Sequence, residues 1–386
     1  MEKLKQYRLI EVLDALIDYR GKTPKKTTSG VPLITAKIIK KGRIESPTEF
    51  ISVDDYDSWM VRGFPKVGDV VLTTEAPLGE VAQLDNANIA LAQRVVTLRG
   101  KTGVLDNTYL KYYFLSNVGQ QRLKARETGT TVTGIKQSEL REVTIDVPPY
   151  AVQVEIAYIL KSIDDKIEVN RRINDNLEQQ AQALFKSWFV DFEPFKDQPF
   201  VESELGMIPH GWRAGKLGEL CQFKRGKGLL SKDAIPGDVP VVAGGLEPSC
   251  YHNVSNTKSP VVTVSGSGAN AGFMRMYYQE VWASDCSFID STCENLFFVY
   301  CFLAINRRLL KHAQTGAVQP HVKPADIHEF DLTIPPKDVI DRFQNIVSET
   351  FLMRGNIANE SRRLAELRDT LLPRLMSGEL KVNDVI

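Results

Sequence analysis

The sequence predicts an α+β protein in which two pseudo-symmetric α/β domains are separated by two long antiparallel helices that form a coiled-coil spacer. Three observations predict this class: an internal repeat, heptad rows after each copy of it, and a proline-containing connector between the copies. The expected order is a first domain over 1–149, a helix over 150–190, a linker over 191–210, a second domain over 211–336, and a second helix with a tail over 337–386.

The repeat sets residues 128–149, TGTTVTGIKQSELREVTIDVPP, beside residues 315–336, TGAVQPHVKPADIHEFDLTIPP. The two segments align over 22 residues without a gap, at an offset of 187, with six identical positions. Further upstream the register drifts, but YRGKTP at 19–24 has a counterpart in FKRGKG at 223–228. The chain is therefore expected to contain two copies of one unit, each a variable domain followed by a helix.

Within each domain, short apolar runs bounded by turn residues predict strands. They lie at 31–39 and 69–74 in the first domain and at 260–266 and 272–278 in the second. Helices are expected near 108–124 and 295–311. Each domain should therefore have a mixed α/β fold.

After each Pro-Pro step the apolar spacing becomes helical. The first helix carries two heptad rows, Ile156, Ile163, Asn170, Leu177 and Leu184, and Leu160, Ile167, Asn174, Ala181 and Trp188. The second carries a stripe of Phe343, Val347, Ile357, Leu364, Leu371 and Leu375, interrupted by Arg354 and Arg368. The first helix should end near Phe189, and the second must run back along it to bury its stripe, so the pair should be antiparallel. An alternative is that each helix packs only on its own domain.

The charge distribution indicates a polyanionic ligand. The formal net charge is zero, but residues 20–43 hold eight basic residues and no acid, whereas residues 150–205 hold eleven acids and six bases. A second, smaller basic cluster contains Lys224, Arg225, Lys227 and Lys232. Two unlike domains held apart by a rod of about 60 Å suit a ligand with two separated sites, such as duplex DNA. The alternative is that these clusters are solvated surface.

Catalytic and metal sites are not expected in the chain. The stretch TIDVPPY resembles the motif with which adenine methyltransferases hold a flipped base, but Val147 stands where an amine-binding residue is needed. The Pro-Pro step is better explained as the end of a strand and the start of a helix. The glycine spacing in GSGANAG does not fit a dinucleotide site. Five cysteines without a CxxC spacing argue against a zinc site or a disulfide framework.

No signal segment or run of about 18 apolar residues is present, so a cytoplasmic protein without a membrane partner is expected.

The order of these motifs resembles the specificity (S) subunits of type I restriction-modification enzymes from end to end. The motifs that carry this resemblance are TGTTVTGIKQSEL followed by VPP, a helix ending in QALFKSWFVDFEPF, a second domain with SGSGANAG, and a final helix ending in LRDTLLPRLMSGEL. The resemblance implies that each domain is a target-recognition domain for one half of a bipartite, asymmetric sequence in double-stranded DNA. It also implies that the helices set the spacing and dock methyltransferase (M) subunits, with restriction or translocase (R) subunits in the same complex. S-adenosylmethionine and ATP with Mg²⁺ would then bind partner subunits, and no cofactor would bind this chain.

The DNA-binding residues are expected on the basic clusters and on loops that correspond in the repeat. Lys136 and Lys323 occupy equivalent positions and are candidates for paired phosphate contacts, whereas Thr74, Glu75, Ser265 and Ser267 lie in equivalent loops that are expected to face the groove. The remaining candidates are basic residues: Arg20, Lys22, Lys25, Lys37, Arg225, Lys227 and Arg275. The alternatives in other classes are a stand-alone DNA adenine methyltransferase and a coiled-coil adaptor that does not bind DNA.

If the paired helices set the distance between half-sites, adding one heptad after Asn170 and a matching heptad after Ile357 should lengthen the rod by roughly 10 Å. This length corresponds to about three more base pairs between two unchanged half-sequences. Methylation mapping of a genome that carries the extended variant measures the gap. An active variant with an unchanged gap would show that the spacing is set elsewhere.

Overall fold

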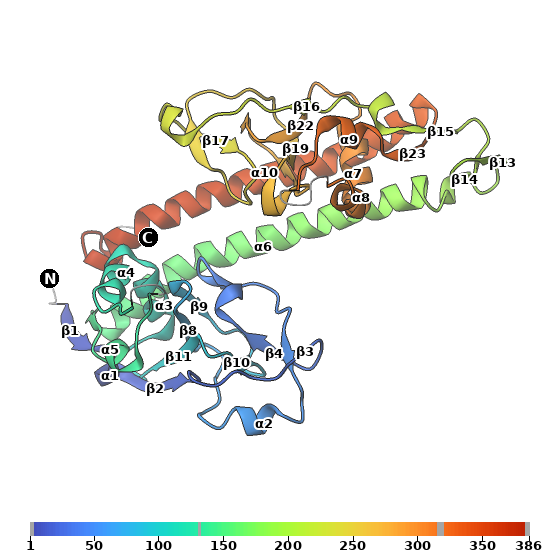
Figure 1. Cartoon of the computed structure of the whole chain (residues 1–386). Helices are drawn as coiled ribbons and strands as arrows, with labels where there is room; N and C mark the ends of the chain where they lie inside the picture. Colours follow the sequence, from blue (N-terminus) through green and yellow to red (C-terminus); the bar gives the residue numbers. More distant parts are fainter. Residues whose placement is uncertain (1–3, 130–132, 315–319, 383–386) are drawn as a thin grey trace. The chain divides into compact units, whose positions relative to one another are not determined.

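The computed structural model of the chain describes residues 4–129, 133–314 and 320–382, so parts of the repeat, 130–132 and 315–319, lie outside the described residues. The chain divides into two compact units (Figure 1). Unit 1 comprises Met1–Ile167 and Arg363–Ile386, and unit 2 comprises Glu168–Arg362. Each unit therefore contains one α/β domain together with a part of both long helices.

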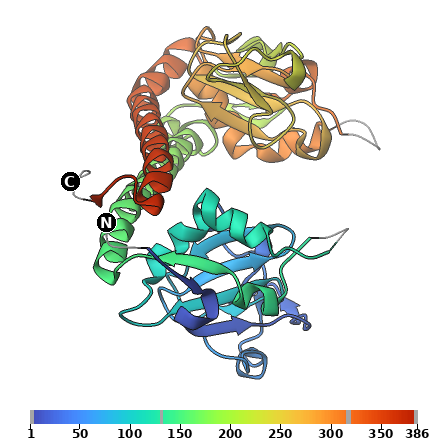
Figure 2. The ribbon, with the colours of Figure 1, turned by 90° about the vertical axis from the view of Figure 1, so that its left-hand side faces the viewer.

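Unit 1 is built around an antiparallel sheet with the strand order β2-β11-β8-β9. These strands are β2 (Leu13–Asp18), β11 (Val95–Gly100), β8 (Val70–Thr74) and β9 (Leu78–Gln83). The run of apolar residues in β8 is buried on both faces, as expected for a central strand. Two helices, α3 (Asn107–Leu115) and α4 (Asn117–Lys124), pack on one face of this sheet and form the core with it (Figure 2).

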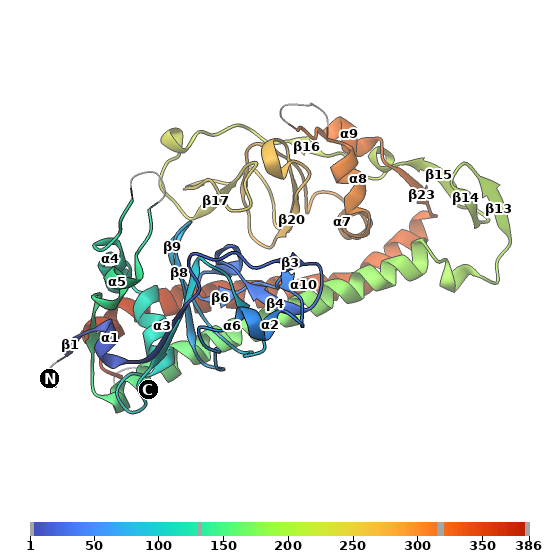
Figure 3. The same cartoon turned by 60° about the horizontal axis from the view of Figure 1, so that its bottom comes forward.

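The remaining elements of unit 1 form a second, smaller sheet and its borders. The second sheet has the strand order β10-β4-β7-β3, of which β3 and β4 are labelled in Figure 3. A separate apolar cluster includes residues of β4, β7 and β10. The elements are β10 (Ala90–Leu91), β4 (Val31–Ile34), β7 (Phe50–Ile51), β3 (Lys26–Thr27), the hairpin β5 (Ile39–Lys40) and β6 (Arg43–Ile44), the pair β1 (Lys5–Arg8) and β12 (Thr144–Val147), the 3-10 helix η1 (Ala36–Ile38), and the helices α1 (Leu9–Val12), α2 (Tyr56–Trp59) and α5 (Gln137–Arg141).

Unit 2 repeats this plan. Its antiparallel sheet has the order β16-β22-β19-β20, formed by β16 (Lys224–Arg225), β22 (Cys286–Asp290), β19 (Val261–Ser265) and β20 (Met274–Tyr277). Its smaller sheet has the order β18-β17-β21, formed by β18 (Cys250–His252), β17 (Val239–Val242) and β21 (Trp282–Ala283). The other elements are the hairpin β13 (Phe200–Ser203) and β14 (Gly206–Pro209), the pair β15 (Arg213–Lys216) and β23 (Asp331–Ile334), the helices α7 (Leu296–Ile305), α8 (Arg307–His312) and α9 (Pro324–His328), and the 3-10 helices η2 (Glu193–Phe195), η3 (Leu217–Glu219), η4 (Ser231–Asp233) and η5 (Gly268–Asn270).

The larger sheet and the strand pair before each Pro-Pro step correspond between the two units, whereas the smaller sheet has four strands in unit 1 and three in unit 2. In unit 1, β1 pairs with β12, the strand that precedes Pro148, and in unit 2, β15 pairs with β23, the strand that precedes Pro335. Each smaller sheet also contains one parallel pair, β4 with β10 and β17 with β21. The predicted pseudo-symmetric α/β repeat is therefore confirmed, including the upstream part where the sequence register drifts.

Three predicted elements are interrupted. The strand expected over 31–39 is broken into β4, η1 and β5. The helix expected near 108–124 is divided at Ser116, whose hydroxyl accepts a hydrogen bond from the Gly119 amide at 3.2 Å and so caps α4. The helix expected near 295–311 is divided at Asn306, between α7 and α8, where the Asn306 side chain donates to the Phe302 carbonyl at 2.9 Å rather than capping α8. Side-chain capping by Ser116 therefore explains the first of the two helix breaks.

The Pro-Pro steps join a strand to a long helix, as predicted. In unit 1, α6 (Tyr150–Phe189) begins directly after Pro149, and the side chain of Gln153 is fully buried. Its amide donates to the carbonyls of Val104 and Pro148 at 2.9 Å each, and its carbonyl accepts from the Asp106 amide at 2.9 Å. This one side chain therefore fixes the direction in which the helix leaves the domain.

The second long helix, α10 (Lys337–Ser377), runs antiparallel to α6 within each unit. In unit 1, Asp164 of α6 contacts Arg368 of α10 at 2.8 Å. In unit 2, Asn170 donates to Glu360 at 2.7 Å, and farther along α6, Glu178 pairs with Arg354, which lies earlier in α10. The prediction of antiparallel helices is thus confirmed.

The heptad register holds over only part of α6. Ile156, Leu160, Ile163 and Asn170 are buried as predicted. Toward the end of the helix Ala181 is buried as predicted, and Phe185 and Phe189 are buried as well, whereas the predicted Leu177, Leu184 and Trp188 are only half-buried. Phe185 and Phe189 pack against Phe298 of α7 and Phe343 of α10. The seam prediction was wrong here because α6 contacts the domain of unit 2 as well as α10.

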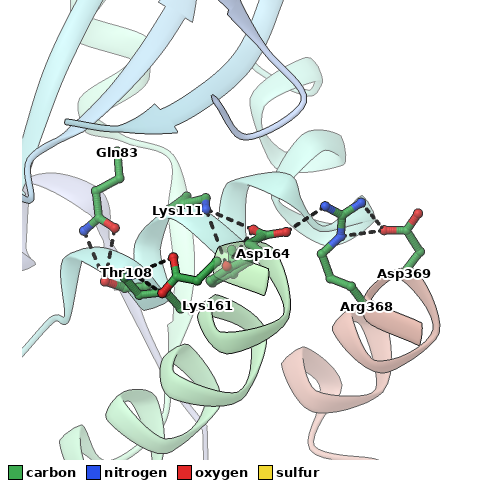
Figure 4. A network of polar contacts seen from close by, with 9 residues as sticks. Gln83, Thr108, Lys111, Lys161, Asp164, Arg368 and Asp369 are labelled. Atoms are coloured by element: carbon green, nitrogen blue, oxygen red, sulfur yellow. Dashed lines mark hydrogen bonds and ion pairs between the residues drawn. The ribbon is translucent and has the colours of Figure 1, made fainter. Parts of the chain in front are cut away.

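The arginines that interrupt the second seam are paired with partly buried acids. In unit 1, the carboxylate of Asp164 contacts Lys111 of α3 at 3.1 Å, accepts a hydrogen bond from the Tyr112 hydroxyl at 2.7 Å, and pairs with Arg368 (Figure 4). Burial opposes ionisation of Asp164, but Lys111, Tyr112 and Arg368 outweigh it and hold the pKa of this carboxyl below its usual value. The cluster ties α3, α6 and α10 together.

Unit 2 has a corresponding cluster, in which α6 again supplies the acid and α10 the arginine. Glu178 of α6 pairs with Arg354 of α10 and accepts a hydrogen bond from the Tyr300 hydroxyl of α7 at 2.6 Å. The Arg354 guanidinium is 8% exposed and lies within 6.0 Å of the ring centres of Tyr278, Tyr300 and Phe351. In unit 1 the acid lies on α6, the helix that follows the domain of that unit. In unit 2 the arginine lies on α10, the helix that follows the domain of unit 2.

Replacing Asp164 by Ala would leave Lys111 and Arg368 without their shared acceptor at a largely buried position. We expect Asp164→Ala to lower the free energy of unfolding of unit 1 by about 3–5 kcal/mol. Because the folded-state pKa of Asp164 is lowered, its contribution is present above the unfolded pKa of about 3.9 and is lost as pH falls through the folded pKa.

The neighbouring Asp165 is the matched control, because its side chain is 60% exposed and pairs along the helix with Lys161 at 2.5 Å. Asp165→Ala should cost about 0–1 kcal/mol. Urea denaturation at neutral and acidic pH compares the two variants. Equal losses for both would contradict the assigned role of Asp164.

Candidate nucleic-acid interface

The loop between β8 and β9 is the structural centre of the candidate interface in unit 1. Its start is fixed on both sides, because the Thr74 amide donates to the Arg94 carbonyl at 3.0 Å and the Thr74 carbonyl accepts from the Ile135 amide at 2.9 Å. Glu75 forms an isolated β-bridge with Gly134. The Glu75 carboxylate then pairs with the Arg94 guanidinium at 2.8 Å, and both side chains are substantially exposed.

Unit 2 builds the equivalent loop, between β19 and β20, with the same backbone contacts. Val322 donates to the Gly266 carbonyl at 3.1 Å, and Ser267 forms an isolated β-bridge with His321. His321 and Val322 correspond to Gly134 and Ile135 at the offset of 187 in the sequence repeat. The predicted equivalence of the loops that carry Glu75 and Ser267 is therefore present in the backbone.

The side chains at this equivalent position differ. The Arg225 guanidinium forms an ion pair with Asp285, and the Ser267 hydroxyl donates to the same carboxylate. A Cβ atom on Gly266 would collide with the Arg225 guanidinium, so the glycine permits this close approach. Asp285 directly precedes β22, as Arg94 directly precedes β11. Unit 1 thus has a base where unit 2 has an acid.

Two of the predicted loop residues are buried. The exposed fraction is 1% for Thr74 and 4% for Ser265, so neither side chain faces outward as expected. Both residues end a central strand, and this location buries their side chains. Glu75 and Ser267 are partly exposed, and among the exposed residues of these loops are Ala76, Pro77 and Ala269.

The basic run of unit 1 separates into exposed and structural residues. Lys22, Lys25 and Lys37 are exposed. Arg20 is half-buried, pairs with the buried carboxylate of Asp18 at 2.6 Å and donates to the Ile135 carbonyl, so its guanidinium already has protein partners. Lys37 lines a depression of about 220 Å³ together with Thr23, Lys26, Ala76, Gln93 and Arg94. The structure therefore brings part of the basic run to the same surface as the β8–β9 loop.

The remaining candidates are placed as follows. Lys136 and Lys323 are both exposed and occupy the N-cap positions of the short helices α5 and α9. Lys227 is exposed, and its ammonium lies 6.0 Å from the centre of the Trp282 ring. Arg275, on β20, is partly buried and lies against the rings of Phe273 and Tyr277. Among these four residues the three lysines are exposed to solvent, whereas Arg275 is partly buried.

Sequence reasoning missed Arg94, Gln93 and Asp285. None of them belongs to a basic cluster or to the aligned repeat. The available signal was the position of Arg94 and Asp285 directly before the apolar strand runs VVTL and CSFI, with Gln93 one residue earlier, and the drift of the repeat register concealed it.

Other kinds of site are not indicated in the described part of the chain. Val147 is buried in β12, so the Pro-Pro-Tyr stretch forms the start of α6 rather than a base pocket. Over residues 4–129, 133–314 and 320–382 there is no group of three His, Cys, Asp or Glu side chains that could hold a metal ion. None of the described helices is both long and apolar enough to cross a membrane.

The cysteines are all free thiols. The sulfur atoms of Cys221 and Cys293 lie 2.9 Å apart in unit 2, and this contact lowers the pKa of Cys293.

Comparison with known proteins identifies the relatives of this chain. Residues 1–179 and 209–367 match the family model described as the type I restriction modification DNA specificity domain. The chain is 31% identical over 349 residues to the type I restriction enzyme MjaIX specificity subunit of Methanocaldococcus jannaschii, an alignment that covers 84% of this chain and 80% of that protein. It is 24% identical to the type I restriction enzyme HindI specificity subunit of Haemophilus influenzae, in an alignment that covers 82% of this chain and 87% of that protein.

A solved structure shares the fold. The crystal structure of the type I restriction-modification S subunit from M. genitalium is similar with a TM-score of 0.57 and 19% sequence identity. The similarity covers 97% of this chain and 96% of that one.

The equivalent positions of Lys136 and Lys323 predict one phosphate contact in each unit. Changing either residue to Ala should weaken DNA binding for all sequences alike and reduce the slope of log K against log salt concentration by about one unit, because one fewer counterion is released. Binding titrations at several salt concentrations measure the slope, and Lys101→Ala, which removes an exposed lysine that donates to the Glu11 carbonyl at 2.8 Å, is the control. A changed base preference would show instead that the lysine reads sequence.

Proposed function

The chain belongs to the type I restriction-modification DNA specificity family, and from this membership we propose that it is the DNA sequence-recognition subunit of a type I restriction-modification complex. Unit 1 and unit 2 each read one half of a bipartite, asymmetric target in double-stranded DNA. The chain is a specificity subunit rather than an enzyme, as its relatives are named.

The observation that carries this proposal is the difference between two otherwise equivalent loops. Both units have the same sheet order and the same backbone bridge, which places Glu75 and Ser267 at the same point of the fold. Beside that point, unit 1 has Arg94 and unit 2 has Asp285 with Arg225. Hydrogen-bonding groups of different charge on one scaffold suit two half-sequences that differ.

The exposed lysines supply the part of the binding energy that does not depend on sequence. Lys22, Lys25, Lys37 and Lys136 in unit 1, and Lys227 and Lys323 in unit 2, are exposed and suit phosphate contacts. Arg20 contributes indirectly, because its pair with Asp18 and its bond to the Ile135 carbonyl hold the segment that precedes Lys136. Arg275 of unit 2 is a weaker candidate for a DNA contact, because its guanidinium lies against two aromatic rings.

The long helices dock the methyltransferase subunits and set the spacing between the half-sites. Large apolar side chains on both helices are exposed, among them Tyr158 at 72% and Leu352 at 60%. Aromatic side chains such as Tyr158 are enriched at protein interfaces, and this is consistent with the proposed docking. In this proposal the partner M subunits bind S-adenosylmethionine, and the R subunits bind ATP and Mg²⁺.

The two alternative classes have less support. A stand-alone adenine methyltransferase would need an amine-binding group before Pro148, where Val147 is buried. A coiled-coil adaptor would not require two diverged polar loops on a shared scaffold. Family membership favours the specificity subunit over both.

We expect the purified chain to transfer no methyl group to DNA by itself, because the catalytic chemistry resides in partner subunits. Co-expression with the M subunits of its own system should instead produce adenine methylation at one bipartite motif. Transfer of a labelled methyl group and methylation mapping of genomic DNA measure these two outcomes, with the M subunits alone as the control. Methyl transfer by the chain alone would contradict the proposal, and so would the absence of a motif from the assembled complex.

A further inference from the structure

We propose that Arg94 in unit 1 and Arg225 in unit 2 are the base-reading arginines of the two half-sites, each oriented by a carboxylate, Glu75 and Asp285 respectively. The inference rests on the proposed function and deepens it, because it names the side chains that distinguish one sequence from another. It also separates them from the lysines that contact phosphates.

Arg94 is fixed at both its backbone and its side chain. Its carbonyl accepts from the Thr74 amide at 3.0 Å, which ties it to the end of the central strand β8. The ion pair with Glu75 is made through Nε, at 2.8 Å. A guanidinium has five N–H donors in a planar fork, so a pair made through Nε leaves donors for the edge of a base.

Arg225 is held differently at the equivalent place. Its Nη2 pairs with Asp285, and Asp285 is fixed in turn by the Ser267 hydroxyl. The side chain of Arg225 is 46% exposed, nearly the same as the 47% of Arg94. Gly266 leaves room for the guanidinium beside the loop. Both arginines are therefore accessible, and both are oriented before any ligand binds.

The two arginines lie on or directly before strands that do not correspond between the units. Arg94 directly precedes β11, and the position directly before the corresponding β22 belongs to Asp285. In unit 2 the cation comes instead from β16, which pairs with β22. The guanidinium thus reaches the loop from a different strand in each unit, which would place it against a different base position.

Pairing with a carboxylate favours base reading over a phosphate contact. An exposed ion pair contributes little to stability, so neither arginine is expected to be required for folding. The carboxylate also cancels much of the charge that would attract a phosphate. What remains is a planar donor group with a fixed orientation, which suits the O6 and N7 acceptors of guanine.

A neighbouring side chain in unit 1 extends this polar surface. The side-chain carbonyl of Gln93 accepts a hydrogen bond from the Thr23 hydroxyl at 3.1 Å. Gln93 and Arg94 line the same depression of about 220 Å³. A glutamine amide is suited to an adenine edge, so Gln93 provides a second polar group beside the arginine.

The test is methylation mapping with the full chain assembled with its M subunits. Arg94→Ala should reduce the preference for guanine at one position of one half-sequence by about 10- to 100-fold, and leave the other half-sequence unchanged. Arg225→Ala should do the same in the other half only. Arg94→Lys keeps the charge but not the fork, so it should also lose the guanine preference while the complex stays active.

Matched controls are two exposed arginines in similar ion pairs away from the loops. Arg8 pairs with Glu11 at 2.9 Å in unit 1, and Arg213 pairs with Glu219 at 2.7 Å in unit 2. Arg8→Ala and Arg213→Ala should leave both half-sequences unchanged. Co-purification with the M subunits confirms assembly for every variant, and Arg94→Lys replaces Arg94→Ala if the latter does not assemble.

The outcomes separate this inference from the proposed function. Lower methylation at all sites with an unchanged motif would make the arginines phosphate contacts and overturn the inference alone. A change in the same half-sequence for both Arg94 and Arg225 variants would also overturn it, because it requires one arginine for each half. Absence of any motif for the unaltered chain with its partners would instead overturn the proposed function.

Discussion

The ion pairs of the Asp164 carboxylate are the interaction on which the packing of α3, α6 and α10 in unit 1 depends. The long helices have too few apolar residues to form an uninterrupted seam, and at Asp164 a charge from α6 receives Lys111 from α3 and Arg368 from α10. In unit 2, Glu178 of α6 and Arg354 of α10 have this role. A buried charge requires its partner, so these clusters define how α6 and α10 pair within each unit.

The two units show how one scaffold can present different chemistry. Their sheets, their strand-to-helix turns and the bridges behind their loops correspond. These features depend on backbone hydrogen bonds and on apolar side chains, which many sequences can supply. The groups beside the bridges, Arg94 in one unit and Asp285 in the other, are not needed for the fold. Recognition can therefore vary while the architecture stays the same.

Much of the fold could be predicted because the repeat and the heptad spacing are periodic signals. The Pro-Pro turns, the antiparallel helices and the central strands β8 and β19 follow from them. The burial of Phe185 and Phe189 could not be predicted, because it depends on contact with Phe298, which is far away in the sequence. For the same reason the sequence placed Thr74 at the surface and did not single out Arg94, since the pairing of neighbouring strands decides which side of a strand end is exposed.

The turn at Gln153 has a consequence for how such chains can diversify. All three of its partners are main-chain groups, the carbonyls of Val104 and Pro148 and the amide of Asp106. Main-chain groups are present whatever the side chain, so the joint places little demand on the identity of the residues around it. A recombination event that replaced the whole segment before Pro148 with that of a relative of the same fold would recreate the joint without any compensating mutation. New target sequences could then be acquired by exchanging whole gene segments rather than by accumulating single substitutions.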